Sequence, residues 1–333
     1  MQKLSGKLRI YYFSVMALSL VAAVLCCVAL FTSYDGEKGY FDASLTVSLM
    51  KAVAVVATIF CFTPLFLLPK GELDGISPAT IPTFIPSVYM ALVSMAISVI
   101  LFVSIGGIDI GVFTVFIRSF QSSVPALILF AFAGIMCLGS ATYFILNFFA
   151  AGASRKQNEM QALAGYAVLF ASCCLIALSY FDRSVSMNAP GKLFFNLSTI
   201  LFMLFMLCEL RTLLECPKPR LYLVSGALTM VFSAVSSLPW LIAFAFGKAK
   251  GPIYPTYLIY FLFTFGIFAY TAVRLGVFVS ARSLAERMAE NAPPEEDPAD
   301  ISDEDLGDEP SASDDSNDSG DDSGDDSESR NGL

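Results

Sequence analysis

The chain has 333 residues, of which 56% are hydrophobic and 15% are charged, whereas soluble globular proteins average about 45–50% and about 25%. This composition excludes an ordinary soluble globular protein and predicts a membrane protein. Histidine is absent, which disfavours metal sites and catalytic triads because histidine is the commonest metal ligand and general base. We therefore expect no metal, no cofactor and no nucleic-acid partner, and we regard an enzyme as less favoured than a non-enzyme.

The formal net charge of −9 hides a separation of charge along the chain. Residues 290–333 contain 18 acidic residues and one Arg, and residues 1–289 contain 11 acidic and 19 basic residues. The N-terminal part therefore carries a net charge of +8 and the C-terminal tail a net charge of −17. The acidic character of the whole chain belongs to its tail.

Eight apolar stretches are long enough to cross a bilayer, because about 20 helical residues span a hydrocarbon core of about 30 Å. They comprise residues 11–31, 49–68, 86–106, 125–150, 162–179, 193–213, 221–243 and 255–279. The first stretch follows a basic segment but precedes no small-residue cleavage site, so we expect it to remain attached as a signal anchor. The predicted fold class is an all-α, polytopic integral membrane protein with eight transmembrane helices.

The distribution of basic residues along the chain predicts the orientation of the chain in the cell membrane. With the N-terminus inside, twelve Lys or Arg residues fall on the cytoplasmic side and seven on the outer side, and cytoplasmic loops are the ones that carry an excess of these residues. Both termini are therefore predicted to be cytoplasmic. Trp240, Tyr254 and Tyr257 would then form an aromatic belt at the outer interface.

The motif GYFDAS at residues 39–44 returns as SYFDRS at residues 179–184, in each case just after an apolar stretch ends. Other pairs keep the same order along the chain, including Tyr143 with Tyr270 and the double cysteines 26–27 with 173–174. Such collinear matches predict a tandem duplication of a four-helix unit, with both copies oriented the same way in the membrane. Independent resemblance between apolar sequences is the alternative.

The duplication predicts four segments. Residues 1–153 would form the first four-helix half and residues 154–280 the second. Residues 281–291 are expected to form a short juxtamembrane helix. Residues 292–333, which are rich in Asp, Glu, Ser and Gly, are expected to be disordered because they contain too few apolar side chains to offset their ordering entropy.

Asp42 and Asp182 occupy the same position in the two copies of the repeated motif. Asp-x-Ser supplies side-chain oxygens for turn and helix-cap hydrogen bonds, and this is the simpler interpretation. The alternative is that both aspartates line a shared outer vestibule that attracts a cation or an amine.

A polar constellation is predicted in two of the apolar stretches. Tyr143 and Asn147 are four residues apart and share a helix face, as do Tyr270 and Arg274. Together with Gly139 and Gly266, each four residues earlier, they could line a polar crevice between the two halves. The alternative is that the glycines pack, the tyrosines bond to backbone, and Asn147 and Arg274 reach the membrane surface.

Charged residues are scarce within the apolar stretches. Glu209, Arg211 and Arg274 all fall near predicted cytoplasmic ends, and Arg274 lies about 7.5 Å of helix rise from the end of its stretch, within reach of the surface for a long side chain. No acid falls in the middle of a stretch. Proton or sodium coupling through a buried acid is therefore not expected.

Two functions remain open at this point. One is the transport of a small solute through a crevice between the halves. The other is a sensor or assembly protein without a substrate, whose dry helical bundle and cytoplasmic surface bind partners. In either case the lipid bilayer is the main partner, and the acidic tail either repels anionic lipid or docks to a basic partner.

Overall fold

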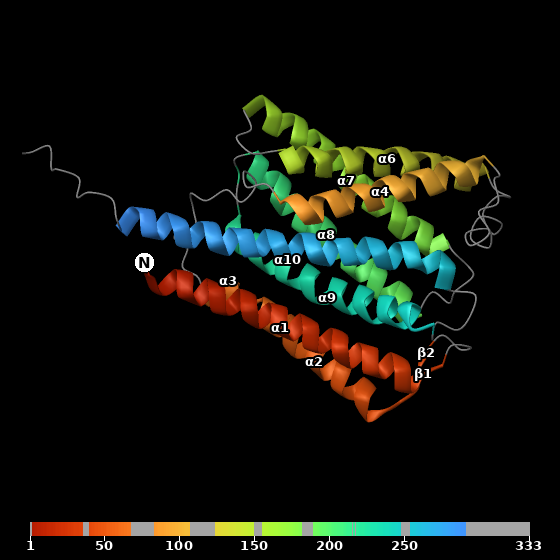
Figure 1. Cartoon of the computed structure of the whole chain (residues 1–333), viewed down its shortest axis with the longest axis horizontal. Helices are drawn as coiled ribbons and strands as arrows, with labels where there is room; N and C mark the ends of the chain where they lie inside the picture. Colours follow the sequence, from red (N-terminus) through yellow and green to blue (C-terminus); the bar gives the residue numbers. More distant parts are fainter. Residues whose placement is uncertain are drawn as a thin grey trace, which may run out of the picture. The chain divides into compact units, whose positions relative to one another are not determined.

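The structure is a computed structural model that describes residues 2–35, 40–67, 83–106, 124–149, 155–181, 189–214, 216, 218–247 and 254–290. Within these ranges, eight helices are long and apolar enough to cross a membrane (Figure 1). By length and composition the chain is therefore a multi-pass, helical membrane protein.

The elements follow one another as α1 (Gln2–Ser33), β1 (Tyr34–Asp35), β2 (Tyr40–Phe41), α2 (Leu45–Cys61), α3 (Thr63–Leu67), α4 (Phe84–Ile105), α6 (Val124–Phe149), α7 (Arg155–Phe181), α8 (Pro190–Leu213), α9 (Pro219–Ala245) and α10 (Tyr254–Glu290). All eight predicted stretches coincide with spanning helices to within several residues. Helix α10 continues without interruption through residues 281–290, where the sequence predicts a separate juxtamembrane helix. The predicted disordered tail, residues 292–333, lies outside the described residues.

Serine and proline residues mark several helix starts. Ser44 precedes α2 in an extended conformation, and its hydroxyl accepts a hydrogen bond from the backbone N–H of Val47, as expected of an N-cap serine. Helices α8 and α9 begin with Pro190 and Pro219, where the missing proline N–H has no helical partner to lose.

The second spanning segment is broken into α2 and α3, although the sequence predicts one continuous helix there. Pro64 has no N–H to donate to the carbonyl of Phe60, and that carbonyl instead accepts a hydrogen bond from the Thr63 hydroxyl at 2.8 Å. The Tyr11 hydroxyl of α1 donates to the carbonyl of Cys61 at 3.0 Å. The side chains of Thr63 and Tyr11 thus satisfy backbone groups at the break.

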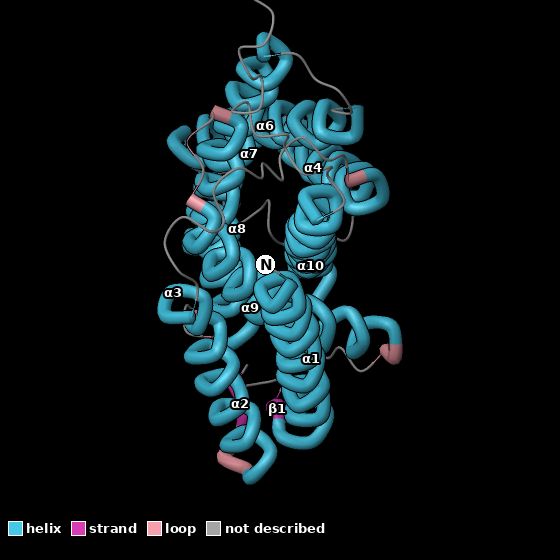
Figure 2. The backbone as a smooth tube through the Cα atoms, turned by 90° about the vertical axis from the view of Figure 1, so that its left-hand side faces the viewer, coloured by secondary structure: helices cyan, strands magenta, loops and turns pink. Residues whose placement is uncertain are grey.

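Helix α9 occupies the centre of the packing and contacts α1, α2, α3, α8 and α10. A second group of helices forms a closed series of contacts, in which α4 packs on α6, α6 on α7, α7 on α8, α8 on α10, and α10 on α4. Figure 2 shows these five helices around a common axis, with α1 and α2 placed beyond α9. We call α4, α6, α7, α8 and α10 the five-helix ring.

Large apolar side chains cover the outward faces of the bundle. Leu45, Phe66 and Ile85 are each more than 80% exposed, and many Leu, Ile, Val and Phe residues on α1, α2, α4 and α6 are at least 36% exposed. Soluble monomers rarely expose contiguous apolar surface of this kind. A lipid-facing surface explains it, because hydrocarbon chains solvate apolar side chains without cost.

Trp240 and Tyr257 are buried in the protein, so the predicted aromatic belt is wrong for these two residues. The Trp240 ring stacks on Phe261, with ring centroids 5.3 Å apart, and it meets Tyr34 edge to face. The side chain of Tyr254 lies outside the described residues. Tertiary aromatic packing therefore takes the place of membrane anchoring at Trp240 and Tyr257.

The predicted duplication receives no decisive support from helix packing. If the halves were copies, α2 would correspond to α8 and α4 to α9. Helix α8 packs extensively on α9, whereas within the described residues α2 has no comparable contact with α4. Residues 1–291 form one compact unit. The tandem repeat stays a prediction.

Candidate functional site

The structure brings Asn147, Tyr270 and Arg274 into direct contact, and all three are fully buried. The Asn147 amide donates to the Tyr270 hydroxyl at 2.9 Å, and an Nη of Arg274 donates to the Asn147 carbonyl oxygen at 3.1 Å. The Nε of Arg274 also donates to the Tyr270 hydroxyl at 3.3 Å. The four-residue spacing on α10 thus aligns Tyr270 and Arg274 toward one residue of α6.

Glu209 of α8 forms a salt bridge with the same guanidinium, and both side chains are fully buried. The sequence-based expectation that Arg274 extends to the membrane surface is therefore wrong. A buried carboxylate on a neighbouring helix offers the guanidinium a partner inside the protein, and five N–H donors in a planar fork let it bond to Asn147 and Tyr270 as well. Glu209, expected at a cytoplasmic end, is the charged residue of this site that the sequence reasoning missed, and it also missed Thr83, Ser87 and Tyr222, described below.

Helix α4 joins the site through two hydroxyl side chains. The Asn147 amide lies 3.4 Å from the Thr83 hydroxyl and 3.3 Å from the Ser87 hydroxyl. These two hydroxyls lie 3.0 Å from each other, so either can donate. Asn147 therefore links α4 to α10.

Two further tyrosines surround the ion pair without hydrogen bonds of their own. Tyr143 and Tyr222 are buried, and within the described part of the chain neither hydroxyl has a hydrogen-bond partner. The Tyr143 hydroxyl lies near that of Tyr270 and the Tyr222 hydroxyl lies near the Glu209 carboxylate, but neither contact has the geometry of a hydrogen bond. A buried hydroxyl without a partner costs roughly 1–3 kcal/mol, so these two groups are candidates to bind a ligand or water.

We call the set of Thr83, Ser87, Tyr143, Asn147, Glu209, Tyr222, Tyr270 and Arg274 the buried polar cluster. Its members come from α6, α8, α9 and α10 and from the start of α4. Asn147 and Glu209 lie near the ends of their helices, and Ser87 and Tyr222 lie near the starts of theirs. In an antiparallel bundle these positions meet at one end, which is the predicted cytoplasmic end.

Aromatic rings close the cluster on the side facing the middle of the bundle. Phe144 lies edge to face against both Tyr143 and Tyr270, with ring centroids 5.2 Å apart in each case. Phe202 and Phe205 of α8 also pack on Tyr270, with centroids 6.4 and 6.5 Å away. The low-dielectric surroundings strengthen the interaction between Glu209 and Arg274 and raise the cost of leaving either one alone.

The glycine of each predicted set lies at a close contact between helices. A Cβ added to Gly266 would lie 2.3 Å from the Met90 sulfur and 2.9 Å from the Tyr89 ring. A Cβ added to Gly139 would lie 2.7 Å from the Ala167 Cβ. Helix α10 can approach α4, and α6 can approach α7, because these positions lack side chains.

The outer-vestibule hypothesis remains untested. The Asp42 side chain is exposed, and its backbone N–H donates to the Ser33 carbonyl at 2.7 Å. The Ser44 hydroxyl, which caps α2, also accepts a hydrogen bond from the Ser33 hydroxyl at 2.8 Å. Asp182 lies outside the described residues.

The described residues contain no group of three or more His, Cys, Asp or Glu that could hold a metal ion. All eight cysteines are free. No family model, curated protein or solved structure matches the chain. The chemistry of the buried polar cluster is therefore the evidence from which a function can be argued.

Proposed function

We propose that the protein transports a small solute across the cell membrane, and that the buried polar cluster lies on the pathway. The supporting observation is the fully buried ion pair between Glu209 and Arg274, with two tyrosine hydroxyls beside it that lack hydrogen bonds within the described residues. Charged side chains inside a membrane-spanning bundle are costly and mark substrate pathways in many transporters. In a bundle with a purely structural role, hydrophobic side chains of similar volume would stabilise the fold as well as the buried ion pair does, or better.

The chemistry of the cluster favours a solute that carries a carboxylate or a similar anionic group. Arg274, Asn147 and the tyrosine hydroxyls are hydrogen-bond donors, and the Glu209 carboxylate now occupies the guanidinium. A planar guanidinium binds carboxylates with two parallel hydrogen bonds. In this proposal Glu209 holds the place of the solute's anionic group until the solute enters.

The described conformation is then a closed one, because every member of the cluster has almost no exposed surface. Arg274 ties α10 to α6 and α8, and Asn147 ties α6 to the start of α4. Opening the predicted cytoplasmic end would require these contacts to separate. The predicted halves, residues 1–153 and 154–280, are the bodies that would move in this proposal, since α4 and α6 belong to the first and α8 and α10 to the second.

Thiol labelling tests whether water reaches the cluster. The background is a variant in which all eight cysteines are replaced, and the reporter is Ser87→Cys, a nearly isosteric change in the cluster. We expect slow labelling by a membrane-impermeant methanethiosulfonate reagent in proteoliposomes, and at least tenfold faster labelling when Glu209→Gln is added, because the ion pair no longer holds the helices together. A single-cysteine protein that retains Cys26, which lies on α1 and is equally buried against α2 and α9, is the matched control and should not label.

A flux assay then tests transport itself. The protein in proteoliposomes is offered a panel of labelled carboxylates, amines and neutral sugars, and we expect uptake of at least one carboxylate that is lost in Arg274→Lys. Lysine keeps the charge but not the planar fork. Two results together would contradict transport. The Ser87→Cys reporter would stay unlabelled with and without Glu209→Gln, and no member of the panel would be taken up.

The alternative is a non-transporting sensor or assembly protein. The observation that favours it is the complete burial of the cluster, because a dry core could use the ion pair only to fix which helices pack together. The acidic tail would then supply the docking segment for a basic partner. Unlabelled Ser87→Cys in every background is the result expected of this alternative.

A further inference from the structure

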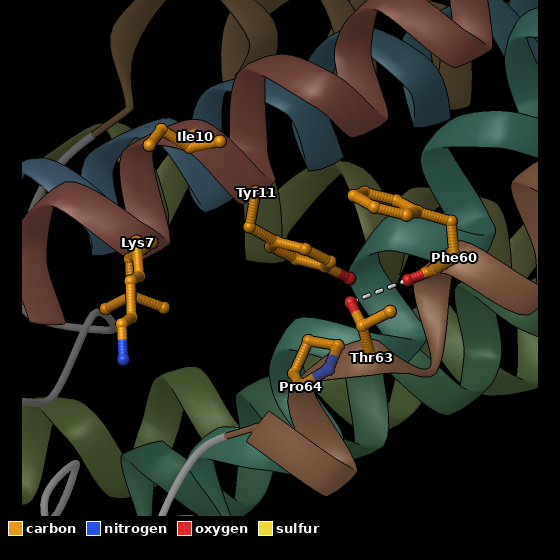
Figure 3. Close-up of a pocket in the computed structure, with 7 residues that line it drawn as sticks. Lys7, Ile10, Tyr11, Phe60, Thr63 and Pro64 are labelled. Atoms are coloured by element: carbon orange, nitrogen blue, oxygen red, sulfur yellow. Dashed lines mark hydrogen bonds between the residues drawn. The ribbon is translucent and has the colours of Figure 1, made fainter.

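A groove lies on the surface of the bundle between α1 and the break that separates α2 from α3 (Figure 3). Its volume is about 360 Å³, within the range of small-molecule sites, about 300–1,000 Å³. Its lining consists of Lys7, Leu8, Ile10, Tyr11, Phe60, Thr63 and Pro64. Figure 3 shows Tyr11 reaching from α1 toward Thr63 and Phe60, with Lys7 on the same helix as Tyr11.

The helix break builds one wall of this groove. Helix α2 ends at Cys61 and α3 begins at Thr63, and the Tyr11 hydroxyl is held by the Cys61 carbonyl. The Tyr11 ring stacks on Phe60, with centroids 5.8 Å apart. The polar atoms of Tyr11 and Thr63 bond to backbone carbonyls, so the wall that remains for a ligand is mostly apolar.

The surroundings of the groove determine what can fill it. Ile10, Ile59 and Phe66 beside it are each at least 65% exposed, which identifies this side of the bundle as lipid-facing. The groove lies at the ends of two spanning segments, Gly6–Ser33 and Leu45–Phe66, so it extends from headgroup level toward the hydrocarbon, where water is absent. A lipid acyl chain is the molecule present there at high concentration and with matching chemistry.

Lys7 determines which lipid fits best. Its side chain is exposed, and within the described part of the chain it has no ion-pair partner. Lys7 lies one turn before Tyr11 on α1, so its ammonium is placed beside the mouth of an apolar groove. A basic residue near the end of a spanning helix attracts anionic headgroups.

We propose that this groove binds one acyl chain of an anionic phospholipid whose phosphate pairs with Lys7. The site is separate from the buried polar cluster, and it does not depend on whether the protein transports a solute. The occupant is an annular lipid selected by charge and not a soluble ligand.

Fluorescence quenching by brominated lipids tests this site. Trp240, the only tryptophan, is replaced by Phe to keep its stacking, and Phe60→Trp places a reporter in the groove wall. In nanodiscs of unlabelled phosphatidylcholine, brominated phosphatidylglycerol should quench this reporter at a several-fold lower mole fraction than brominated phosphatidylcholine does. Lys7→Gln should remove that preference, and Lys51→Gln, a change of an exposed lysine elsewhere on α2, should leave it intact.

A second reporter separates the groove from the bilayer in general. Phe244→Trp lies on a half-exposed position of α9, and both lipids should quench it equally. Thr63→Phe, which fills the groove, should weaken quenching of the Phe60→Trp reporter by both lipids. Three results would each overturn the proposal. The two lipids could quench the Phe60→Trp reporter equally, or Lys7→Gln and Lys51→Gln could have equal effects. The third is no quenching at all, which is expected if the chain itself covers the groove.

Discussion

Arg274 bonds to residues on two other helices through a single planar group. Its guanidinium contacts Glu209 on α8, Asn147 on α6, and Tyr270 one turn earlier on its own helix. An ammonium also has three donors, but they rotate on a flexible stem, whereas the guanidinium holds five donors in one rigid plane. The position therefore requires arginine in particular and not merely a positive charge.

Removing one partner of the ion pair should destabilise the protein more than removing both. Arg274→Met leaves the Glu209 carboxylate buried without a counter-charge, and we expect it to lower the free energy of unfolding by about 3–5 kcal/mol. The double variant Arg274→Met with Glu209→Leu should recover part of that loss, giving a coupling energy of about 0.5–3 kcal/mol. The measurement is a double-mutant cycle by chemical unfolding in detergent micelles.

Arg211→Met supplies the matched control for this cycle. Arg211 lies on α8 only two residues after Glu209 but is exposed, so its loss should change the unfolding free energy by no more than about 0.5 kcal/mol. Additive effects of Arg274→Met and Glu209→Leu would show that the two side chains do not interact, contrary to the described site.

The sequence could predict part of this site but not the pairing within it. The four-residue spacing places Tyr143 and Asn147 on one face of α6, and Tyr270 and Arg274 on one face of α10, because helical periodicity is local. Glu209 escaped prediction because its depth and its partner depend on which helices pack against α8. Local periodicity does not reveal which helices pack together, and a charge near a helix end has the surface as its default location.

At the scale of the helices, the contact between α4 and α10 depends on a residue that has no side chain. Gly266 lies one turn before Tyr270, and the Met90 sulfur and Tyr89 ring fill the space where its Cβ would be. The Tyr89 hydroxyl donates to the Leu262 carbonyl of α10 at 3.0 Å, so this ring is not free to move away. The close approach of α4 in turn places Ser87 within reach of Asn147.

Gly266→Ala should therefore loosen the packing of α4 on α10. We expect a loss of about 1–3 kcal/mol in the free energy of unfolding, because a methyl group is forced into a filled space. Thermal unfolding in detergent measures the effect. Gly6→Ala on α1 is the control, because nothing lies within 4 Å of an added Cβ there and alanine has a higher helix propensity than glycine. An equal loss of stability in both variants would mean that the close contact at Gly266 has no special role.

Helix existence followed from the sequence more readily than helix continuity. All eight stretches were found by length and hydropathy, because lipid forces every spanning segment to satisfy its backbone internally. The break between α2 and α3 was not predicted, although Pro64 is visible in the sequence. Proline in a spanning helix is tolerated when other groups satisfy the freed carbonyls. Here the neighbouring Thr63 hydroxyl satisfies the Phe60 carbonyl, and Tyr11 of another helix satisfies the Cys61 carbonyl, a contact that depends on tertiary packing.

At the scale of the whole molecule, the separation of charge along the chain is a property of the sequence that folding does not alter. Residues 1–289 carry an excess of basic residues, and the acidic residues gather in the tail. The described helices place the apolar residues both in the core and on the outward faces, as expected when lipid replaces water around the bundle. Composition alone could reveal the membrane class, whereas sidedness depends on the weaker difference between twelve and seven basic residues.

Labelling at the two ends of α9 tests that sidedness directly. Helix α9 has 27 residues and is about 40 Å long, enough to separate its flanking residues by the full thickness of a bilayer. Leu214, just before this helix, and Phe246, just after it, are both well exposed, so failure to label would report sidedness and not burial. In a cysteine-free background, Phe246→Cys should react with an impermeant thiol reagent in intact cells, and Leu214→Cys only after permeabilisation, because the cytoplasmic side holds the larger number of Lys and Arg. The reverse pattern would place both termini outside the cell, and labelling of both sites in intact cells would mean that α9 does not cross the membrane.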